Sequence, residues 1–351
     1  MMRPSKRFLA VVFFMSMVMA GSIGWAVEAD PISEGSWTMI VLPDTQHYSL
    51  TYPDIFTAQT QWIADHKTSH NIQMVVHEGD ITHLKTVAEF DNAKKSMSVL
   101  DAAGVPYSMC AGNHDYKLST RFTLFNDDAY FGPKSAYAKQ PTIAGFYKEG
   151  KTDSSYSTFK AGGNDWLVLS LEYAPCDEVI AWANGVAAAH PDHHIILNTH
   201  VYLYCDGTRY DWATRGSSQR WSPHEHGNDG QQLWDKLVKK HPNWRFVLNG
   251  HVLANGTGWL ASKGDHGNVV HQILANYQVR TNGGDGYLRI MEFISDGDTV
   301  KMSTYSPYQH AYLTAPDQKF TLRMSQLPPP TSKKPAKPKK DVPAKPSVKQ
   351  G

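Results

Sequence analysis

The sequence predicts an α/β fold whose main sheet is built from strand–helix–strand units. Short apolar runs alternate with amphipathic stretches over the first two thirds of the chain, which is typical of βαβ connections. The last third is a succession of strand-like runs, which favours antiparallel strands added to the sheet. At 351 residues, of which 41% are hydrophobic, the chain is long enough to bury a full core.

The expected elements follow one another in a regular order. Five apolar runs predict strands that end in polar residues, at 38–43, 72–78, 105–110, 193–200 and 244–251. Helices are expected between them, at 54–68, 87–101, 177–190 and 230–241. The closing strands are expected in the runs VVHQILANYQ, YLRIMEFI and TVKMSTYS. In sheets of this kind the functional loops lie at the carboxyl ends of the strands.

The N-terminus predicts a secretory signal peptide over residues 1–26. A basic start, MMRPSKR, precedes 13 apolar residues and an exit rich in small residues. This apolar run is short for a membrane span, which needs about 20 residues. We expect cleavage after Ala26; the alternatives are cleavage after Ala20 and retention as an uncleaved anchor. The expected location is therefore secreted or periplasmic.

The charge of the chain is unevenly distributed. The net charge is +1, but the first 26 residues contribute +3 and residues 331–351 contribute +6, so the body between them is acidic, about −8. An acidic body argues against a nucleic-acid-binding surface. We expect a globular domain over 35–325 and a disordered Pro/Lys-rich tail over 328–351. The charge of the tail suits a weak contact with an anionic cell envelope, and the alternative is a solvated linker.

The chain has three cysteines. Export makes a disulfide permissible, and an odd count leaves at least one thiol unpaired. Cys110 lies in an apolar run and is predicted to be buried. Cys176 and Cys205 each follow a predicted strand, so a disulfide between them and two free thiols are both compatible with the sequence.

Residues able to bind metal follow each of the five predicted strands. They are Asp44, Asp80, Asn113, His200 and His251, in strand order. Each is weak evidence alone, because an aspartate after a strand is often a helix cap or turn residue and a lone histidine is often a surface group. Five such residues in the same position predict one shared metal site at the rim of a sheet.

The motifs that hold these residues, PDTQ, GD, GNHD, NTH and GH, resemble those of the calcineurin-like metallophosphoesterases over roughly residues 37–255. The resemblance implies a four-layer αββα sandwich of two mixed sheets, with a dinuclear metal centre at its rim. It also implies an enzyme, a metal-dependent phosphoric ester hydrolase. The alternative is a degenerate metal-binding scaffold with one metal ion and little activity.

The resemblance implies a role for each motif residue. Asp80 would bridge two metal ions, and Asp44 would bind the first of them. The other ligands of the second ion would be Asn113, His200 and His251. His114 resembles the acid/base histidine of the family, and Asp115 would accept a hydrogen bond from its other ring nitrogen. Oxygen and imidazole ligands suit one or two ions of Mn, Fe, Zn or Co.

Two positions depart from the family pattern, and both belong to the first metal ion. Gln46 stands where the family has a histidine, and Leu253 stands where a second histidine belongs. A glutamine oxygen is a weaker neutral ligand, and leucine provides none. We therefore expect the first site to bind metal weakly or to borrow another ligand, for which the candidates are His47, His83 and His77.

The substrate-facing candidates lie in loops that follow the fourth predicted strand. The stretch 202–212 mixes aromatic residues with Arg209, which could clamp a phosphate or form an ordinary surface ion pair. The stretch 224–229 could hold metal or cap the next helix. The expected partner is a small phosphate ester; the motifs do not distinguish a monoester from a diester, since they hold the phosphoryl group and not the leaving group.

Overall fold

The computed structural model describes residues 28–117, 122–215 and 227–328, so the predicted signal peptide and nearly all of the predicted tail lie outside the described residues. Two seven-stranded mixed sheets form the centre of the molecule. The first has the order β13-β12-β11-β1-β2-β3 with β14 beside β12, and its strands are β1 Trp37–Leu42, β2 Ile72–His77, β3 Tyr107–Met109, β11 Leu288–Phe293, β12 Thr299–Ser306, β13 Ala311–Leu313 and β14 Phe320–Arg323. The second has the order β4-β5-β6-β7-β8-β10-β9, and its strands are β4 Ile143–Phe146, β5 Ser155–Ala161, β6 Asn164–Leu171, β7 His194–Thr199, β8 Trp244–Asn249, β9 Thr257–Lys263 and β10 Val269–Ala275.

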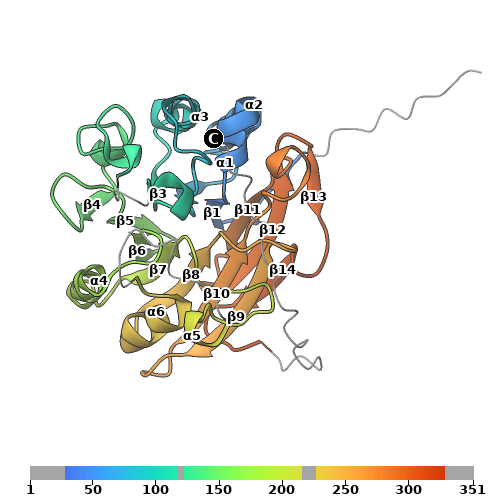
Figure 1. Ribbon diagram of the computed structural model, residues 1–351. Coiled ribbons are helices and arrows are strands. Elements are labelled where there is room, and N and C mark those ends of the chain that lie inside the picture. The colour runs from blue at the N-terminus through green and yellow to red at the C-terminus, as the bar shows by residue number, and fades with distance from the viewer. Residues whose placement is uncertain (1–27, 118–121, 216–226, 329–351) are drawn as a thin grey trace, which may run out of the picture.

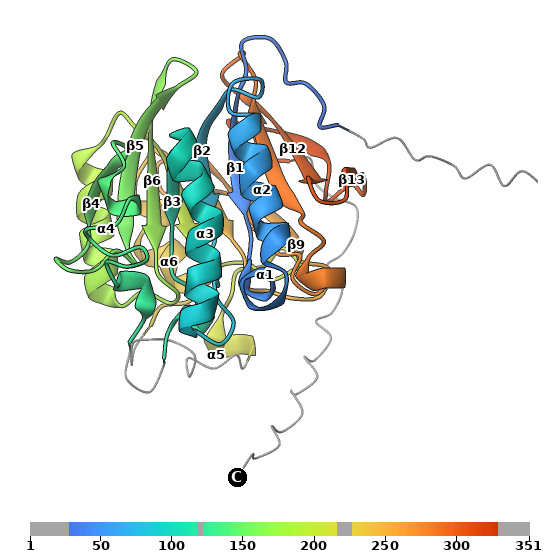
Figure 2. The same cartoon turned by 90° about the horizontal axis from the view of Figure 1, so that it is seen from above.

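Helices cover the outer faces of both sheets (Figure 1). The first sheet is covered by α1 Gln46–Thr51, α2 Pro53–Asp65 and α3 Val87–Ala103, and Figure 2 shows α2 and α3 side by side along it. The second sheet is covered by α4 Asp177–Ala189 and α6 Gly230–Lys236. The remaining short helices are α5 Trp212–Arg215, η1 Asn113–Asp115, η2 Leu124–Asn126, η3 Tyr137–Lys139, η5 Val238–Lys240 and η6 Thr281–Gly283.

The core has three apolar layers, one between the sheets and one under each set of helices. The pattern is visible in β1, where Met39 and Val41 pack between the sheets and Ile40 and Leu42 pack against the helices. A strand covered on both faces reads as a continuous apolar run, which is why TMIVL was recognisable. The layers confirm the predicted αββα sandwich.

The parallel strands of each sheet end at a common rim. In the first sheet β1, β2 and β3 are parallel, and β11 is antiparallel to β1. In the second sheet β6, β7, β8 and β10 are parallel. The prediction that all closing strands are antiparallel is therefore wrong for β10, because the unforeseen strand β9 precedes it and forms an antiparallel hairpin with it. As a result β10 also ends at the rim where the candidate ligands lie.

Helix α6 differs from the expected helix at its C-terminus and agrees with it at its N-terminus. The helix expected over 230–241 ends at Lys236, because Leu237 leaves helical geometry with φ −133° and ψ −66°. Its N-terminus is capped by Asp229, which confirms the capping interpretation of the loop before it.

The three cysteines are free; Cys110 is buried, and Cys205 Sγ lies 2.8 Å from the Leu253 carbonyl oxygen. Among the described residues, no helix combines the length and apolar character needed to cross a membrane.

Candidate metal centre

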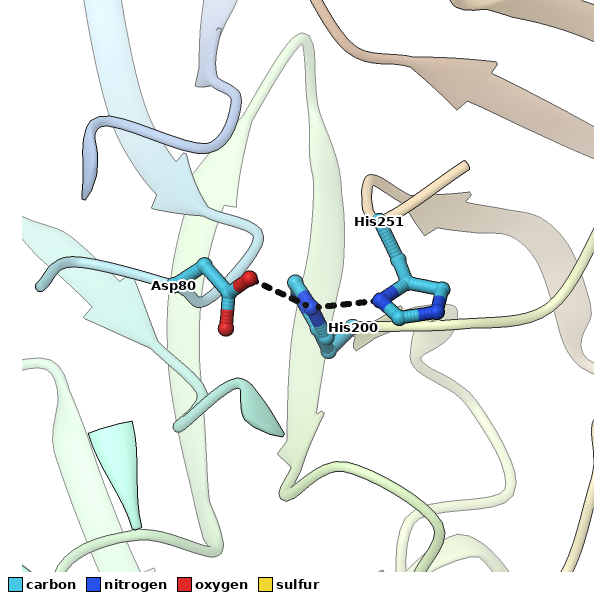
Figure 3. Close-up of side chains that lie close together, drawn as sticks. All are labelled: Asp80, His200 and His251. Carbon is cyan, nitrogen blue, oxygen red and sulfur yellow. Dashed lines mark hydrogen bonds and ion pairs between the residues drawn. The ribbon is translucent and has the colours of Figure 1, made fainter. Parts of the chain in front are cut away.

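The turns that follow β2, β7 and β8 bring three potential metal ligands together. Asp80, His200 and His251 point toward one another from these separate segments (Figure 3). His200 Nε2 lies 3.2 Å from Asp80 Oδ2 and 3.1 Å from His251 Nδ1. Asn113, from the turn after β3, places its Oδ1 atom 3.0 Å from the same His200 nitrogen. The structure thus brings together the four residues that the sequence assigned to one ion.

Close approach of the turns depends on glycine. A Cβ atom on Gly112 would overlap the backbone nitrogen and the carboxylate of Asp80, and one on Gly250 would overlap the Asp44 carboxylate. The backbones of Asp80 and His251 lie in the left-handed region, with φ values of 50° and 66°. This conformation costs about 1–3 kcal/mol per residue outside glycine, and the surrounding structure must compensate for that cost.

The hydrogen bonds of His200 leave a cluster of lone pairs that a cation would satisfy. His200 Nδ1 lies 2.8 Å from the Glu78 carbonyl oxygen, which only accepts, so Nδ1 carries the proton. In the neutral ring Nε2 therefore presents a lone pair to oxygen atoms of Asp80 and Asn113. All three atoms are hydrogen-bond acceptors, so none of them can form a hydrogen bond with another. His200 is also fully buried. One carboxylate, one amide oxygen and two imidazoles are a donor set that fits a divalent transition metal ion.

The pKa values of the candidate ligands also favour a cation at this position. Burial works against the imidazolium form of His200, but the Asp80 carboxylate outweighs it and raises the pKa of His200 to about 9. The Asp80 carboxyl is buried as well, and His200 nevertheless holds the pKa of Asp80 well below its usual range. Burial and the neighbouring His200 lower the pKa of His251 to about 3. In the metal-free protein a proton on His200 thus occupies the place of a cation.

Metal binding is therefore expected to depend on pH. An imidazole must lose its Nε2 proton to bind metal, and the raised pKa means that His200 carries this proton at all pH values below about 9. The apparent dissociation constant for Mn²⁺ should fall about tenfold from pH 7 to pH 8 and less steeply as pH approaches 9, with release of about one proton per ion at pH 7. Calorimetric titration in two buffers of different ionisation enthalpy measures this release. Binding without proton release would contradict the assignment of His200.

Asp44 is held by three hydrogen-bond donors from two segments, the turns that follow β8 and β10. The His251 N–H lies 3.1 Å from Asp44 Oδ1, and Asn276 Nδ2 and Gln278 Nε2 lie 3.2 and 3.3 Å from Asp44 Oδ2. The Gln46 amide contacts the Gln278 amide directly. The motif analysis missed Asn276 and Gln278, although they follow β10 just as the other site residues follow their strands.

The three histidines proposed as substitute ligands for the first ion have other surroundings. His77 is buried, with Nε2 2.9 Å from Thr45 Oγ1 and Nδ1 accepting from the Gly79 N–H at 3.2 Å. His77 therefore packs inside the structure, as its place in the strand suggested. The His83 ring stands between those of His47 and His114, with 4.8 Å between centroids on either side. None of these three rings belongs to the group of potential metal ligands found among the described residues.

His114 is placed against the metal centre by its backbone and its ring. Its N–H donates to Asp80 Oδ1 at 2.8 Å, and its Nδ1 donates to the His83 carbonyl oxygen at 2.8 Å. The predicted hydrogen bond from His114 to Asp115 is wrong. The Asp115 carboxylate instead accepts from the backbone N–H groups of Gly112 and Thr82, because these donors surround it in the buried turn. Asp115 shapes the turn, and a carbonyl oxygen orients His114.

Aromatic side chains line the His251 side of the centre. The Tyr173 and Tyr210 ring centroids lie 5.5 and 6.1 Å from that of His251. Arg209, from the same loop as Tyr210, lies 3.9 Å above the Trp234 ring, and its Nε donates to Gln272 at 2.7 Å. Arg209 thus fixes the loop against the sheet, and a role as a phosphate clamp stays a prediction.

Comparison with known proteins identifies the family. The calcineurin-like phosphoesterase family model matches residues 38–255. The uncharacterized protein YvnB of Bacillus subtilis (strain 168) is 37% identical over 284 residues, which is 79% of this chain but 20% of that protein, so the chain spans about a fifth of this relative. Similar solved structures include a dimetal phosphatase from Danio rerio (12% identity, 84% of this chain, 100% of that chain, TM-score 0.49) and the inner-membrane-complex anchor GAP50 of Plasmodium (10% identity, 83% and 89%, TM-score 0.47). On the family match, the chain belongs to the calcineurin-like phosphoesterase family.

Proposed function

We propose that this chain hydrolyses a small phosphate ester in a reaction that depends on divalent metal ions. The observation that carries the proposal is the buried convergence of Asp80, His200 and His251, with His114 beside it. Bound divalent ions polarise phosphoryl oxygens and make a water molecule a better nucleophile. The side chains that would hold the second ion are Asp80, Asn113, His200 and His251, and Asp44 lies next to them.

His114 is the proposed proton donor to the leaving group. Its Nδ1 is committed to the His83 carbonyl oxygen at 2.8 Å, so Nε2 is the atom that gains or loses a proton. As imidazolium, His114 can donate the Nε2 proton to the leaving oxygen. The stacked ring of His83, with an interplanar angle of 13°, restricts rotation of His114. The aromatic rings of Tyr173 and Tyr210 beside His251 suit an organic leaving group.

The reaction is proposed to take place outside the cytoplasm. The support is the sequence pattern of residues 1–26, with its basic start, apolar run and small-residue exit. The Lys-rich segment over 331–351 would add a weak electrostatic contact with an anionic envelope.

The proposal is tested by turnover of nitrophenyl phosphate and bis(nitrophenyl) phosphate after metal removal and reloading with Mn²⁺ or Zn²⁺. Replacing His114 by glutamine should lower kcat about 10²–10⁴-fold, because a positioned general acid contributes that much, while bound metal stays unchanged. The matched control is His266→Gln, at an exposed histidine that bonds the Lys240 carbonyl oxygen, and it should keep wild-type turnover. A chain that binds metal but hydrolyses neither ester would favour the alternative, a binding module.

A further inference from the structure

The first metal position is surrounded by carboxamides where the family has imidazoles. Gln46 and Gln278 are 3% and 8% exposed, and their amide groups touch beside the Asp44 carboxylate. Leu253, which stands in place of the second family histidine, is 49% exposed and turns away from the core. The buried space near Asp44 is therefore shaped by Gln278, a residue outside the five motifs.

The amide contact leaves one oxygen atom without a partner. Gln46 donates from Nε2 to Gln278 Oε1, and the buried Gln46 Oε1 has no hydrogen-bond partner. An unsatisfied buried acceptor costs about 1–3 kcal/mol. A half-turn of the Gln278 amide exchanges its oxygen and nitrogen, so that Gln278 Oε1 faces Asp44 Oδ2 and Gln278 Nε2 faces Gln46. Two acceptor oxygens then face each other, and the unpartnered Gln46 Oε1 belongs to the adjoining amide, an arrangement that a cation would stabilise.

The Asn276 amide cannot be turned in this way. Its Oδ1 accepts the Gln278 backbone N–H at 3.0 Å, so its Nδ2 must be the atom that faces Asp44. The same segment is tied to the start of β9 through the Asn276 N–H, which donates to the Gly256 carbonyl oxygen at 2.7 Å. Asn276 thus holds Asp44 and Gln278 in place, and Gln278 alone of the two can turn an oxygen toward a metal ion.

We propose that Gln278 replaces the missing imidazole and that Asp44, Gln46 and Gln278 form an all-oxygen site for a divalent cation beside Asp80. The assignment rests on the proposed metal-dependent function. It implies two unlike halves, because the neighbouring half has imidazoles from His200 and His251. Oxygen ligands favour Mg²⁺ or Mn²⁺, whereas imidazoles favour Zn²⁺ and its neighbours. Without the two histidines, the first site was expected to bind metal weakly or to borrow another ligand. In this proposal Gln278 is the borrowed ligand, and the site differs from its neighbour in the metal ions that it prefers.

Metal counting tests the proposal without reference to turnover. The metal-free full chain is titrated with Mn²⁺ at pH 8, and bound ions are counted from the electron paramagnetic resonance signal of free Mn²⁺. Wild type should bind two ions. Gln278→Ala should weaken the ion at Asp44 about tenfold or more and leave the ion at His200 unchanged, since loss of one ligand commonly has at least this effect. The matched control is Gln318→Ala, a buried glutamine that bonds Thr304 instead of Asp44.

Gln278→Glu separates a metal ligand from a hydrogen-bond donor. A glutamate keeps the shape and offers a charged oxygen, so it should tighten binding of the Mn²⁺ ion at Asp44 severalfold. If Gln278 serves only as a hydrogen-bond donor to Asp44, the glutamate removes that donor and the affinity for Mn²⁺ does not rise. A wild-type chain that binds one ion and still hydrolyses esters would overturn this proposal and leave the proposed function intact. A chain that binds no ion would overturn both.

Discussion

Replacing Asp80 by asparagine is expected to abolish metal binding at the His200 side and to lower kcat/KM at least about 10³-fold, the equivalent of several kcal/mol of lost transition-state stabilisation. The Asp80 side chain contacts both His200 and the backbone of His114, through different carboxylate oxygens. Asparagine keeps the shape, but it removes the negative charge that balances the cation. The measurement is metal content after dialysis together with turnover of a nitrophenyl phosphate.

The control for this experiment is Asp153→Asn. Asp153 is a carboxylate of similar burial that accepts hydrogen bonds from Tyr116 and Asn126, away from the metal centre. Its replacement should lower stability without changing the number of bound ions. An Asp80→Asn chain that retains metal and activity within tenfold of wild type would remove Asp80 from the centre.

Replacing Gly112 by alanine should disrupt the centre although every ligand residue is kept. The new Cβ atom would overlap the nitrogen and Oδ1 atoms of Asp80, and backbone atoms of a buried turn cannot move aside cheaply. We expect a loss of about 1–3 kcal/mol in the free energy of unfolding, as for other overpacked sites, and a loss of metal affinity because Asp80 is displaced. Urea denaturation and Mn²⁺ titration measure the two effects.

The matched control is Gly185→Ala in α4. Nothing lies within 4 Å of a Cβ atom at this exposed helical position. Alanine is the better helix former, so the free energy of unfolding should rise by about 0.5–1 kcal/mol. If both alanine variants behaved alike, the turn around Gly112 would be looser than the structure indicates.

The main features of the fold and of one metal site could be predicted from the sequence. Strands buried on both faces appear as continuous apolar runs, and polar residues that end such runs must share a rim when the strands are parallel. Asp80, Asn113, His200 and His251 were recognisable for this reason. Gln278 was not, because it lies 232 residues from Gln46 and because the hairpin of β9 and β10 hid the direction of its strand.

The roles of neighbouring residues were less predictable than their positions. Asp115 follows His114 in the chain, but the two side chains leave a tight 3-10 turn in different directions. The carboxylate is captured by the nearby N–H groups of Gly112 and Thr82. Which partner a buried carboxylate takes depends on the donors that folding brings to it. The GNHD motif alone does not contain that information.

The division of the ligands between the two sheets has a mechanical consequence. The first sheet is assembled from both ends of the described chain, and the second from its middle. Asp80 extends from the first sheet and His200 and His251 extend from the second, so an ion held by all three would act as a cross-link between them. Because a ligand that binds only the folded state stabilises it in proportion to the logarithm of its concentration, a chelator would loosen the sandwich as well as stop its chemistry.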